Sequence, residues 1–390
     1  MSSRGRLLRR LGCRAHAPIL ALLVLCVAAP AAQAVRPGPP SPTLSSSPRL
    51  EQRGVAIDIS FFEPASAELA DVDAAAAMGA NSVRVALDWA GLEPLRRGEY
   101  AGWYLSRVDA LVSRAAARGV KVLLTPLRTP CWAAVPPADG SSLCAAAAGG
   151  QAAAVTPPAD PATYGQFAAF LARRYGSRLA GIEVWNEPNL TSFWSAPDAA
   201  LAYARLLKAA YPLIKRAAPA TPVLAGALAG GDAAFLQRLY DAGINGFYDV
   251  LSVHPYNDGR DPEALIDARW ASATFLQGLR AIRAARDARG DRTPVWLSEL
   301  GWNTSTLRGS LWLDGVSPDQ QADYLVRSLA MLQTATWGID IASGVFVYRL
   351  RDIGVDADDP QHNYGLTGFD GTPKPALAAV RTAYAAAARR

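Results

Sequence analysis

The chain has 390 residues, 51% of them hydrophobic and 19% charged, which is ample for a full core in one large domain or two small ones. It carries 39 basic and 34 acidic residues, and the five excess positive charges are all arginines of the first 34 residues. The rest of the chain is charge-balanced, so its composition gives no support for a nucleic-acid or anionic-membrane partner.

Residues 1–34 have the features of a secretory signal peptide. A basic start precedes an apolar run over 19–29 and a small-residue cleavage site at Ala32-Gln33-Ala34. This run is too short for a membrane span, so we expect a secreted protein, extracellular or periplasmic, without a stable membrane anchor. A lipoprotein attached through Cys26 is the alternative, but bulky Leu25 stands where that signal needs a small residue.

Two of the four cysteines lie in this leader, which leaves Cys131 and Cys144 as a pair. In an oxidising compartment we expect them to form a disulfide that closes a short loop. Two free thiols remain the alternative, because nothing else in the sequence constrains the distance between them.

Residues 35–52 are rich in Pro and Ser and lack apolar periodicity, which indicates a linker before one domain over 53–390. In that domain, short apolar runs alternate with helical patterns, and we count eight of each. The predicted strands cover 54–59, 82–87, 120–125, 181–185, 222–227, 250–254, 295–299 and 344–348. The predicted helices cover 66–79, 104–118, 162–175, 198–216, 232–242, 262–288, 318–336 and 375–388.

Strands rich in Val, Ile and Leu, each followed by a helix, predict a parallel sheet covered by helices. Eight such units fit an α/β fold of the (β/α)8 TIM-barrel type, which typically takes about 250 residues. A doubly wound open sheet is the alternative. The chain has no Gly-x-Gly-x-x-Gly turn after the first predicted strand and no Walker A loop, which weakens the nucleotide-binding versions of that fold.

Two of the predicted strands run into a glutamate at their C-terminal ends, where barrels of this kind build their active sites. In GIEVWNEPNL, residues 181–190, Glu187 lies just past the fourth strand, and in PVWLSELGW, residues 294–302, Glu299 ends the seventh. Glycoside hydrolysis needs two carboxyl groups that flank one bond. Strand alternation places Glu183 deeper on the same face as Glu187, where we expect a buried ion pair or hydrogen bond.

WNEPN and SELGW together resemble the acid/base and nucleophile motifs of the clan A, or 4/7, glycoside hydrolases. The similarity is greatest to families 5 and 39 and to cellulase-like secreted bacterial enzymes. The resemblance covers the folded chain and implies a retaining hydrolase of O-glycosidic bonds in an oligo- or polysaccharide. It implies that Glu187 is the acid/base and Glu299 the nucleophile.

The same resemblance assigns substrate-binding roles to further residues. Arg84, in NSVRVALDW, matches the arginine that hydrogen-bonds the nucleophile, and Asn186 matches the residue that contacts the sugar 2-hydroxyl. His254 and Tyr256, in SVHPY, match a pair that lines the sugar subsite at the reacting carbon. Many relatives place a tryptophan on strand eight as the platform for the sugar, and at this position the chain has Tyr348, which we expect to contact the substrate.

Tryptophans give a further indication of the substrate. Five of the ten fall directly after predicted strands, where flat faces can stack on sugars: Trp89, Trp132, Trp194, Trp302 and Trp312. Trp103, Trp270 and Trp337 lie on predicted helices and are expected to be packing residues. Several sugar subsites at one rim favour an oligomeric or polymeric substrate.

The sequence lacks the residues that zinc-dependent and serine-hydrolase catalysis require. Outside the leader the only histidines are His254 and His362, and the two remaining cysteines are expected to be paired, so a His-rich zinc centre cannot form. There is also no Gly-x-Ser-x-Gly elbow of a serine hydrolase. We therefore expect no metal or cofactor, and a monomer whose partner is the saccharide. A non-catalytic carbohydrate-binding barrel and a transglycosylase are the alternatives.

Overall fold

The computed structural model describes residues 49–136, 144, 153–267, 274–310 and 313–389. The predicted leader and nearly all of the predicted linker lie outside these residues. Leu50 is already buried and the first strand begins at Gln52, so the folded domain starts slightly before the predicted linker ends.

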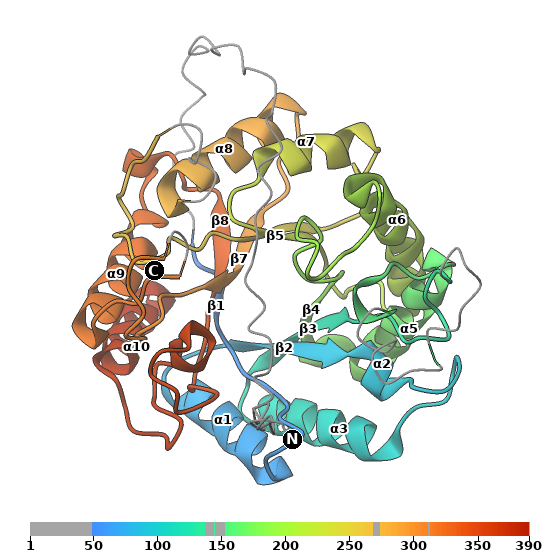
Figure 1. Cartoon of the computed structure of the whole chain (residues 1–390), viewed down its shortest axis with the longest axis horizontal. Helices are drawn as coiled ribbons and strands as arrows, with labels where there is room; N and C mark the ends of the chain where they lie inside the picture. Colours follow the sequence, from blue (N-terminus) through green and yellow to red (C-terminus); the bar gives the residue numbers. More distant parts are fainter. Residues whose placement is uncertain (1–48, 137–143, 145–152, 268–273, 311–312, 390) are drawn as a thin grey trace, which may run out of the picture. The chain divides into compact units, whose positions relative to one another are not determined.

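Eight parallel strands form a closed barrel in the order β1 to β8 (Figure 1). β1 pairs with both β2 and β8, which closes the ring. The strands are β1 (Gln52–Ala56), β2 (Ser82–Asp88), β3 (Lys121–Leu127), β4 (Leu179–Glu183), β5 (Val223–Ala229), β6 (Val250–His254), β7 (Val295–Leu300) and β8 (Ala342–Val347). The predicted (β/α)8 barrel is confirmed, and the open sheet is excluded.

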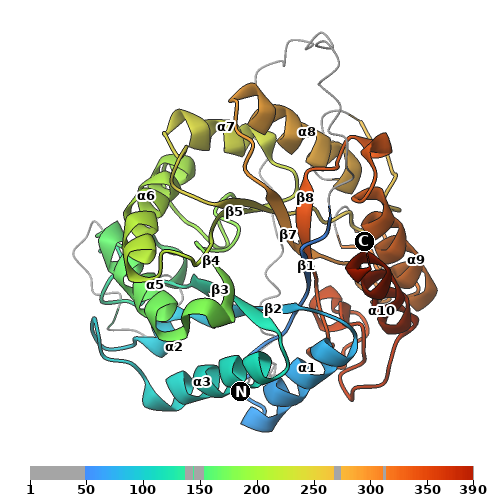
Figure 2. The same ribbon diagram turned by 180° about the vertical axis from the view of Figure 1, so that it is seen from behind.

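Helices surround the barrel on the outside, as both views show (Figures 1 and 2). The α-helices are α1 (Ala65–Ala77), α2 (Trp89–Leu92), α3 (Gly102–Ala117), α5 (Pro161–Tyr175), α6 (Ala199–Ala217), α7 (Ala233–Asp241), α8 (Phe275–Ala288), α9 (Pro318–Met331) and α10 (Pro375–Ala388). Short 3-10 helices are η1 (Gly176–Arg178), η3 (Ala335–Trp337) and η4 (Pro360–Asn363). Among the described residues, no helix combines the length and apolar character needed to cross a membrane.

The predicted helix over 262–288 is wrong in its first half. α8 begins only at Phe275, because the Thr274 hydroxyl accepts a hydrogen bond from the backbone N–H of Gln277 and caps the helix there. The described residues 261–267 form a turn and irregular chain, and 268–273 lie outside the described part. The prediction rested on helical composition alone, so it joined the loop before Thr274 to the helix after it.

The outward faces of the strands pack against the helices. In β2, Val83, Val85 and Leu87 alternate with Arg84 and Ala86, and all three are fully buried. They belong to one continuous apolar cluster that also contains the inner faces of the helices. This packing fixes the strands from outside and leaves the inward positions for other functions.

The barrel interior changes from apolar to polar along the strands. In β6 the inward positions are Val250, Ser252 and His254, in order toward the C-terminal end. Val250 belongs to a separate apolar cluster made of Leu123, Ala180, Leu224, Val250, Trp296 and Phe346. Glycines make room for its rings, since a Cβ on Gly54 would lie 2.1 Å from the Phe346 ring. The polar residues beyond this cluster therefore stand on a tightly packed base.

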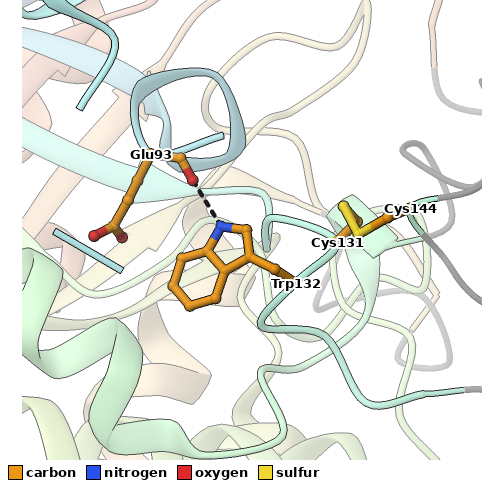
Figure 3. Close-up of a disulfide and its surroundings, with 4 residues drawn as sticks. All are labelled: Glu93, Cys131, Trp132 and Cys144. Atoms are coloured by element: carbon orange, nitrogen blue, oxygen red, sulfur yellow. Dashed lines mark hydrogen bonds between the residues drawn. A yellow bond between two sulfur atoms is a disulfide. The ribbon is translucent and has the colours of Figure 1, made fainter. Parts of the chain in front are cut away.

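Cys131 and Cys144 are joined by a disulfide, which confirms the predicted pairing (Figure 3). Beside it, the indole N–H of Trp132 donates a hydrogen bond to the backbone carbonyl of Glu93 at 2.8 Å. The segment after β3 is thus held against the segment after β2.

We expect the double variant Cys131→Ser/Cys144→Ser to be less stable than the natural chain. A bridge between residues 13 apart restricts the unfolded chain, and loops of this size contribute about 2 to 3 kcal/mol by chain entropy. Thermal or denaturant unfolding with and without a reductant measures the difference. The reductant should destabilise the natural chain and leave the double variant unchanged, and equal stability of the two proteins would contradict the prediction.

Candidate active site

The chain that follows β4 leaves strand geometry to present Glu187. β4 ends at Glu183, two residues earlier than predicted, and φ is then positive at Trp185 (70°) and Glu187 (46°). Non-glycine residues adopt this region at a cost, so the surrounding contacts must hold them there. Trp185 donates from its backbone N–H to the Tyr164 hydroxyl, and Glu187 donates from its backbone N–H to the carbonyl of Ala227.

Glu299, in β7, is held by two donors. Nη1 of Arg84 donates to its Oε1 at 2.5 Å, and the Tyr256 hydroxyl donates to its Oε2 at 2.5 Å. The side chain is buried, with only 8% of its surface exposed. A cation and a hydroxyl on the two oxygens stabilise the ionised carboxylate. The sequence predicted the contact with Arg84, and it predicted that Tyr256 lines the same subsite.

Glu187 lies across from Glu299 and contacts a different residue, His254. Nδ1 of His254 is 2.9 Å from Oε1 of Glu187 and 3.6 Å from Oε2 of Glu299. One oxygen of each glutamate and one nitrogen of His254 all lie within 4.8 Å of one another. Burial raises the pKa of Glu187, and the charge of Glu299 adds to this rise, while the hydrogen bond with His254 opposes it. The two carboxyl groups therefore share one space but differ in their surroundings.

Arg84 connects both sides of the site from beneath. It donates from Nε to Oε2 of Glu183 at 2.8 Å and from Nη2 to Oδ1 of Asn186 at 2.8 Å. Burial disfavours the charge of Arg84, but Glu183 and Glu299 outweigh it, so the pKa of Arg84 rises. The predicted buried ion pair of Glu183 is confirmed, and its partner is Arg84.

Three tyrosine rings gather beside Glu299. Tyr348, directly after β8, has its ring 6.1 Å from that of Tyr256 and 5.4 Å from that of Tyr364. Tyr348 is partly buried, so it can still present an edge or face to a ligand. Tyr364 was missed from the sequence, because it lies in the long segment between β8 and α10, where no periodic pattern places it.

The tryptophans differ most from the sequence prediction. Trp89, Trp194 and Trp302 have at most 1% of their surface exposed, so they pack in the interior and have no free face for a sugar. Trp194 packs on Trp185 and Trp302 donates to the carbonyl of Arg260. Trp132 is partly buried, and Trp270 and Trp312 lie outside the described residues.

Trp103 shows the opposite error. It was expected to be a packing residue, yet 56% of it is exposed in the first turn of α3, while Trp337 is partly buried as expected. Alternation rules locate a residue on a helix or loop, but burial depends on what packs over it.

Metal ligands are scarce in the described part of the chain. One group of acidic and histidine side chains lies close enough together to hold an ion, namely Glu187, His254 and Glu299. A cation there would compete with Arg84, which already donates to Glu299. We keep the absence of a metal as a prediction from the sequence.

A closed (β/α)8 barrel with paired glutamates at the ends of β4 and β7 is the arrangement of a glycoside hydrolase. The chain matches the family model of cellulase, glycosyl hydrolase family 5, over residues 48–329, and it belongs to this family. No curated protein matches it significantly.

Solved structures with the same fold include a family 39 glycoside hydrolase from Bacteroides cellulosilyticus WH2, at 22% identity and a TM-score of 0.65. That match covers 86% of this chain, which spans 64% of the length of that protein. A GH5_18 enzyme from Streptomyces cattleya in complex with Manβ1-4GlcNAc has 19% identity, a TM-score of 0.60 and coverage of 86% and 80%. The exo-β-1,4-mannosidase Op5Man5 from Opitutaceae bacterium strain TAV5 has 19% identity, a TM-score of 0.58 and coverage of 89% and 63%.

Proposed function

We propose that the protein is a secreted, retaining glycoside hydrolase that cleaves an oligo- or polysaccharide. The observation that carries this proposal is the pair of glutamates facing one space, one held by Arg84 and Tyr256, the other by His254. Retaining enzymes bring their carboxyl groups to about 5 to 5.5 Å, and inverting ones to about 6.5 to 9.5 Å. An approach within 4.8 Å between oxygens of Glu187 and Glu299 supports retention.

In the first step, Glu299 attacks the anomeric carbon. The hydrogen bonds from Arg84 and Tyr256 hold its two oxygens in position for the attack. Glu187, whose pKa is raised by burial, donates its proton to the departing oxygen. A covalent glycosyl-enzyme and a free leaving group result.

In the second step, Glu187 acts as a base, because it lost its proton in the first step. It removes a proton from water, which attacks the anomeric carbon from the side that the leaving group vacated. Glu299 departs, and the product keeps the original anomeric configuration. Asn186, whose Oδ1 accepts a hydrogen bond from Arg84, contacts the sugar 2-hydroxyl in this proposal.

The substrate class rests on family membership. The family 5 model is that of cellulases, and two similar folds carry names that refer to β-1,4-mannosidic bonds. We therefore propose a β-linked glucan or mannan, or an oligosaccharide of either. Trp89, Trp194 and Trp302 give no support for a polymeric substrate, because their indoles are buried.

A panel of β-glucans, mannans and xylans, assayed for new reducing ends, tests the activity. We expect release of ends from at least one β-linked polymer, with the first-formed product in the β configuration when the reaction is followed by proton NMR. Binding of a polysaccharide without release of new reducing ends would identify a non-catalytic binding barrel instead. Transfer to an added sugar in preference to water would identify a transglycosylase, and an α product would contradict the double displacement.

A further inference from the structure

Beneath the two glutamates lies a buried series of hydrogen-bonded side chains that has no part in the two proposed chemical steps. Oε1 of Glu183 accepts a hydrogen bond from the Ser252 hydroxyl at 2.6 Å. The hydroxyl oxygens of Ser252 and Ser298 are 2.5 Å apart, and that of Ser298 is 2.9 Å from Nε2 of His254. None of these four side chains has exposed surface. Glu183 is thereby linked to the ring that contacts Glu187.

The protons in this chain can be assigned by counting donors. An ionised carboxylate only accepts hydrogen bonds, and a hydroxyl has one proton to give. Burial opposes the charge of Glu183, but Arg84 and His254 and the serine hydroxyls outweigh it and lower its pKa, so the group is ionised. Ser252 therefore gives its proton to Glu183.

The direction of the first bond fixes the others. Since Ser252 has used its proton, Ser298 gives its own proton either to Ser252, across the 2.5 Å contact, or to Glu183, with which it also hydrogen-bonds. Ser298 then has only a lone pair for His254, so Nε2 of His254 must carry a proton and donate it. In the neutral ring, Nδ1 is left with a lone pair that faces Oε1 of Glu187 at 2.9 Å.

That lone pair has a consequence for the acid. A lone pair and an ionised carboxylate repel, so Nδ1 and Glu187 must hold one proton between them. We propose that Glu183 is a positioning residue that acts through Ser252 and Ser298 to keep a proton on Nε2 of His254 and so to supply Glu187 with an acceptor. The inference deepens the proposed function and rests on it for the role of Glu187.

The other groups around this pair do not reverse the assignment. The titratable groups that interact with His254 or Glu187 are Arg84 from β2, Glu183 from β4, Glu299 in β7, and Tyr348 and Tyr364 after β8. Tyr256, after β6, hydrogen-bonds to Glu299. Burial disfavours the charge of His254, but the carboxylates of Glu299 and Glu187 outweigh it and raise its pKa. In either charge state of the ring, Nε2 keeps its proton.

Nitrogen NMR of the histidines tests the assignment without any substrate. The chain has only three histidines, His16, His254 and His362, so single His→Gln variants assign each ¹⁵N signal. We expect Nε2 of His254 to be protonated across the working pH range. A ring with its only proton on Nδ1 would overturn the proposal, whether or not the enzyme hydrolyses the chosen glycan.

Glu183→Gln should reverse the direction of the hydrogen bonds that run from residue 183 through Ser252 and Ser298 to His254. The amide can donate to Ser252, which then donates to Ser298, which donates to Nε2, so the ring proton moves to Nδ1 and stabilises ionised Glu187. We expect the basic limb of the pH dependence of kcat/KM to move to lower pH by about one unit or more. Ser298→Ala should move it in the same direction, while the contacts of Arg84 stay intact.

Two matched controls separate this effect from loss of stability. Glu68→Gln removes a buried carboxylate that pairs with Arg107 on the outside of the barrel, and Ser328→Ala removes a buried hydroxyl of α9. Both should leave the pH limb in place. A Glu183→Gln variant that keeps the ring proton on Nε2 and the basic limb unchanged would overturn the proposal. If it fails to fold, the NMR result on the natural chain decides.

Discussion

Glu299→Ala is expected to lower kcat by about 10⁴- to 10⁶-fold on every substrate, the scale seen when a hydrolase loses its nucleophile. Without this carboxylate no glycosyl-enzyme can form, and a better leaving group cannot compensate. Arg84 keeps its contacts with Glu183 and Asn186, so the charge beneath the site stays paired. Steady-state kinetics on the best polymer and on an aryl glycoside measure the loss.

Azide gives this prediction its control. A small anion that fills the space left by Glu299 attacks the substrate directly in one displacement, so the glycosyl azide should have the inverted configuration. An unchanged unfolding temperature would confirm that the variant is folded. Turnover within tenfold of the natural enzyme, or an azide product of retained configuration, would show that Glu299 is not the nucleophile.

Much of the fold could be predicted because it depends on local pattern. Eight apolar runs alternating with helical stretches leave few architectures that bury both faces of every strand. The error at 262–288 arose because a single side-chain cap, at Thr274, decides where α8 begins. Such a cap is one residue in a long helical composition and gives little signal.

The position of the two glutamates opposite one another could be predicted for a different reason. Glu187 lies shortly after the end of β4 and Glu299 lies at the end of β7, and a barrel brings all strand ends to one face. Distance along the chain then matters little. Arg84 and Tyr256 followed from motif resemblance, and the geometry places both within hydrogen-bond reach of Glu299.

The positions missed from the sequence are those that depend on what covers a side chain. Trp194 and Trp302 follow strands as expected, yet both are enclosed, because loops and helices pack over them. Ser252 and Ser298 are small, ordinary strand residues, and their meeting at 2.5 Å depends on the register of β6 and β7. Inward alternation from His254 and Trp296 could have placed both serines inside the barrel.

Glu187→Ala should lower kcat/KM by about 10²- to 10⁴-fold on substrates with poor leaving groups, the usual contribution of a general acid. Aryl glycosides whose leaving groups need no proton should be largely spared in the first step. Burial raises the pKa of Glu187, so activity of the natural enzyme should fall as pH rises through a value above that of an ordinary glutamate. The alanine variant should lose this basic limb on activated substrates.

External azide distinguishes Glu187 from Glu299. In Glu187→Ala the glycosyl-enzyme still forms on Glu299 and waits for a base that is absent, and azide attacks without needing one. We therefore expect azide to accelerate turnover and to give a glycosyl azide of retained configuration, since two displacements occur. An inverted azide product from this variant, together with a retained one from Glu299→Ala, would exchange the two roles. Equal loss on activated and unactivated substrates would instead remove proton donation from the functions of Glu187.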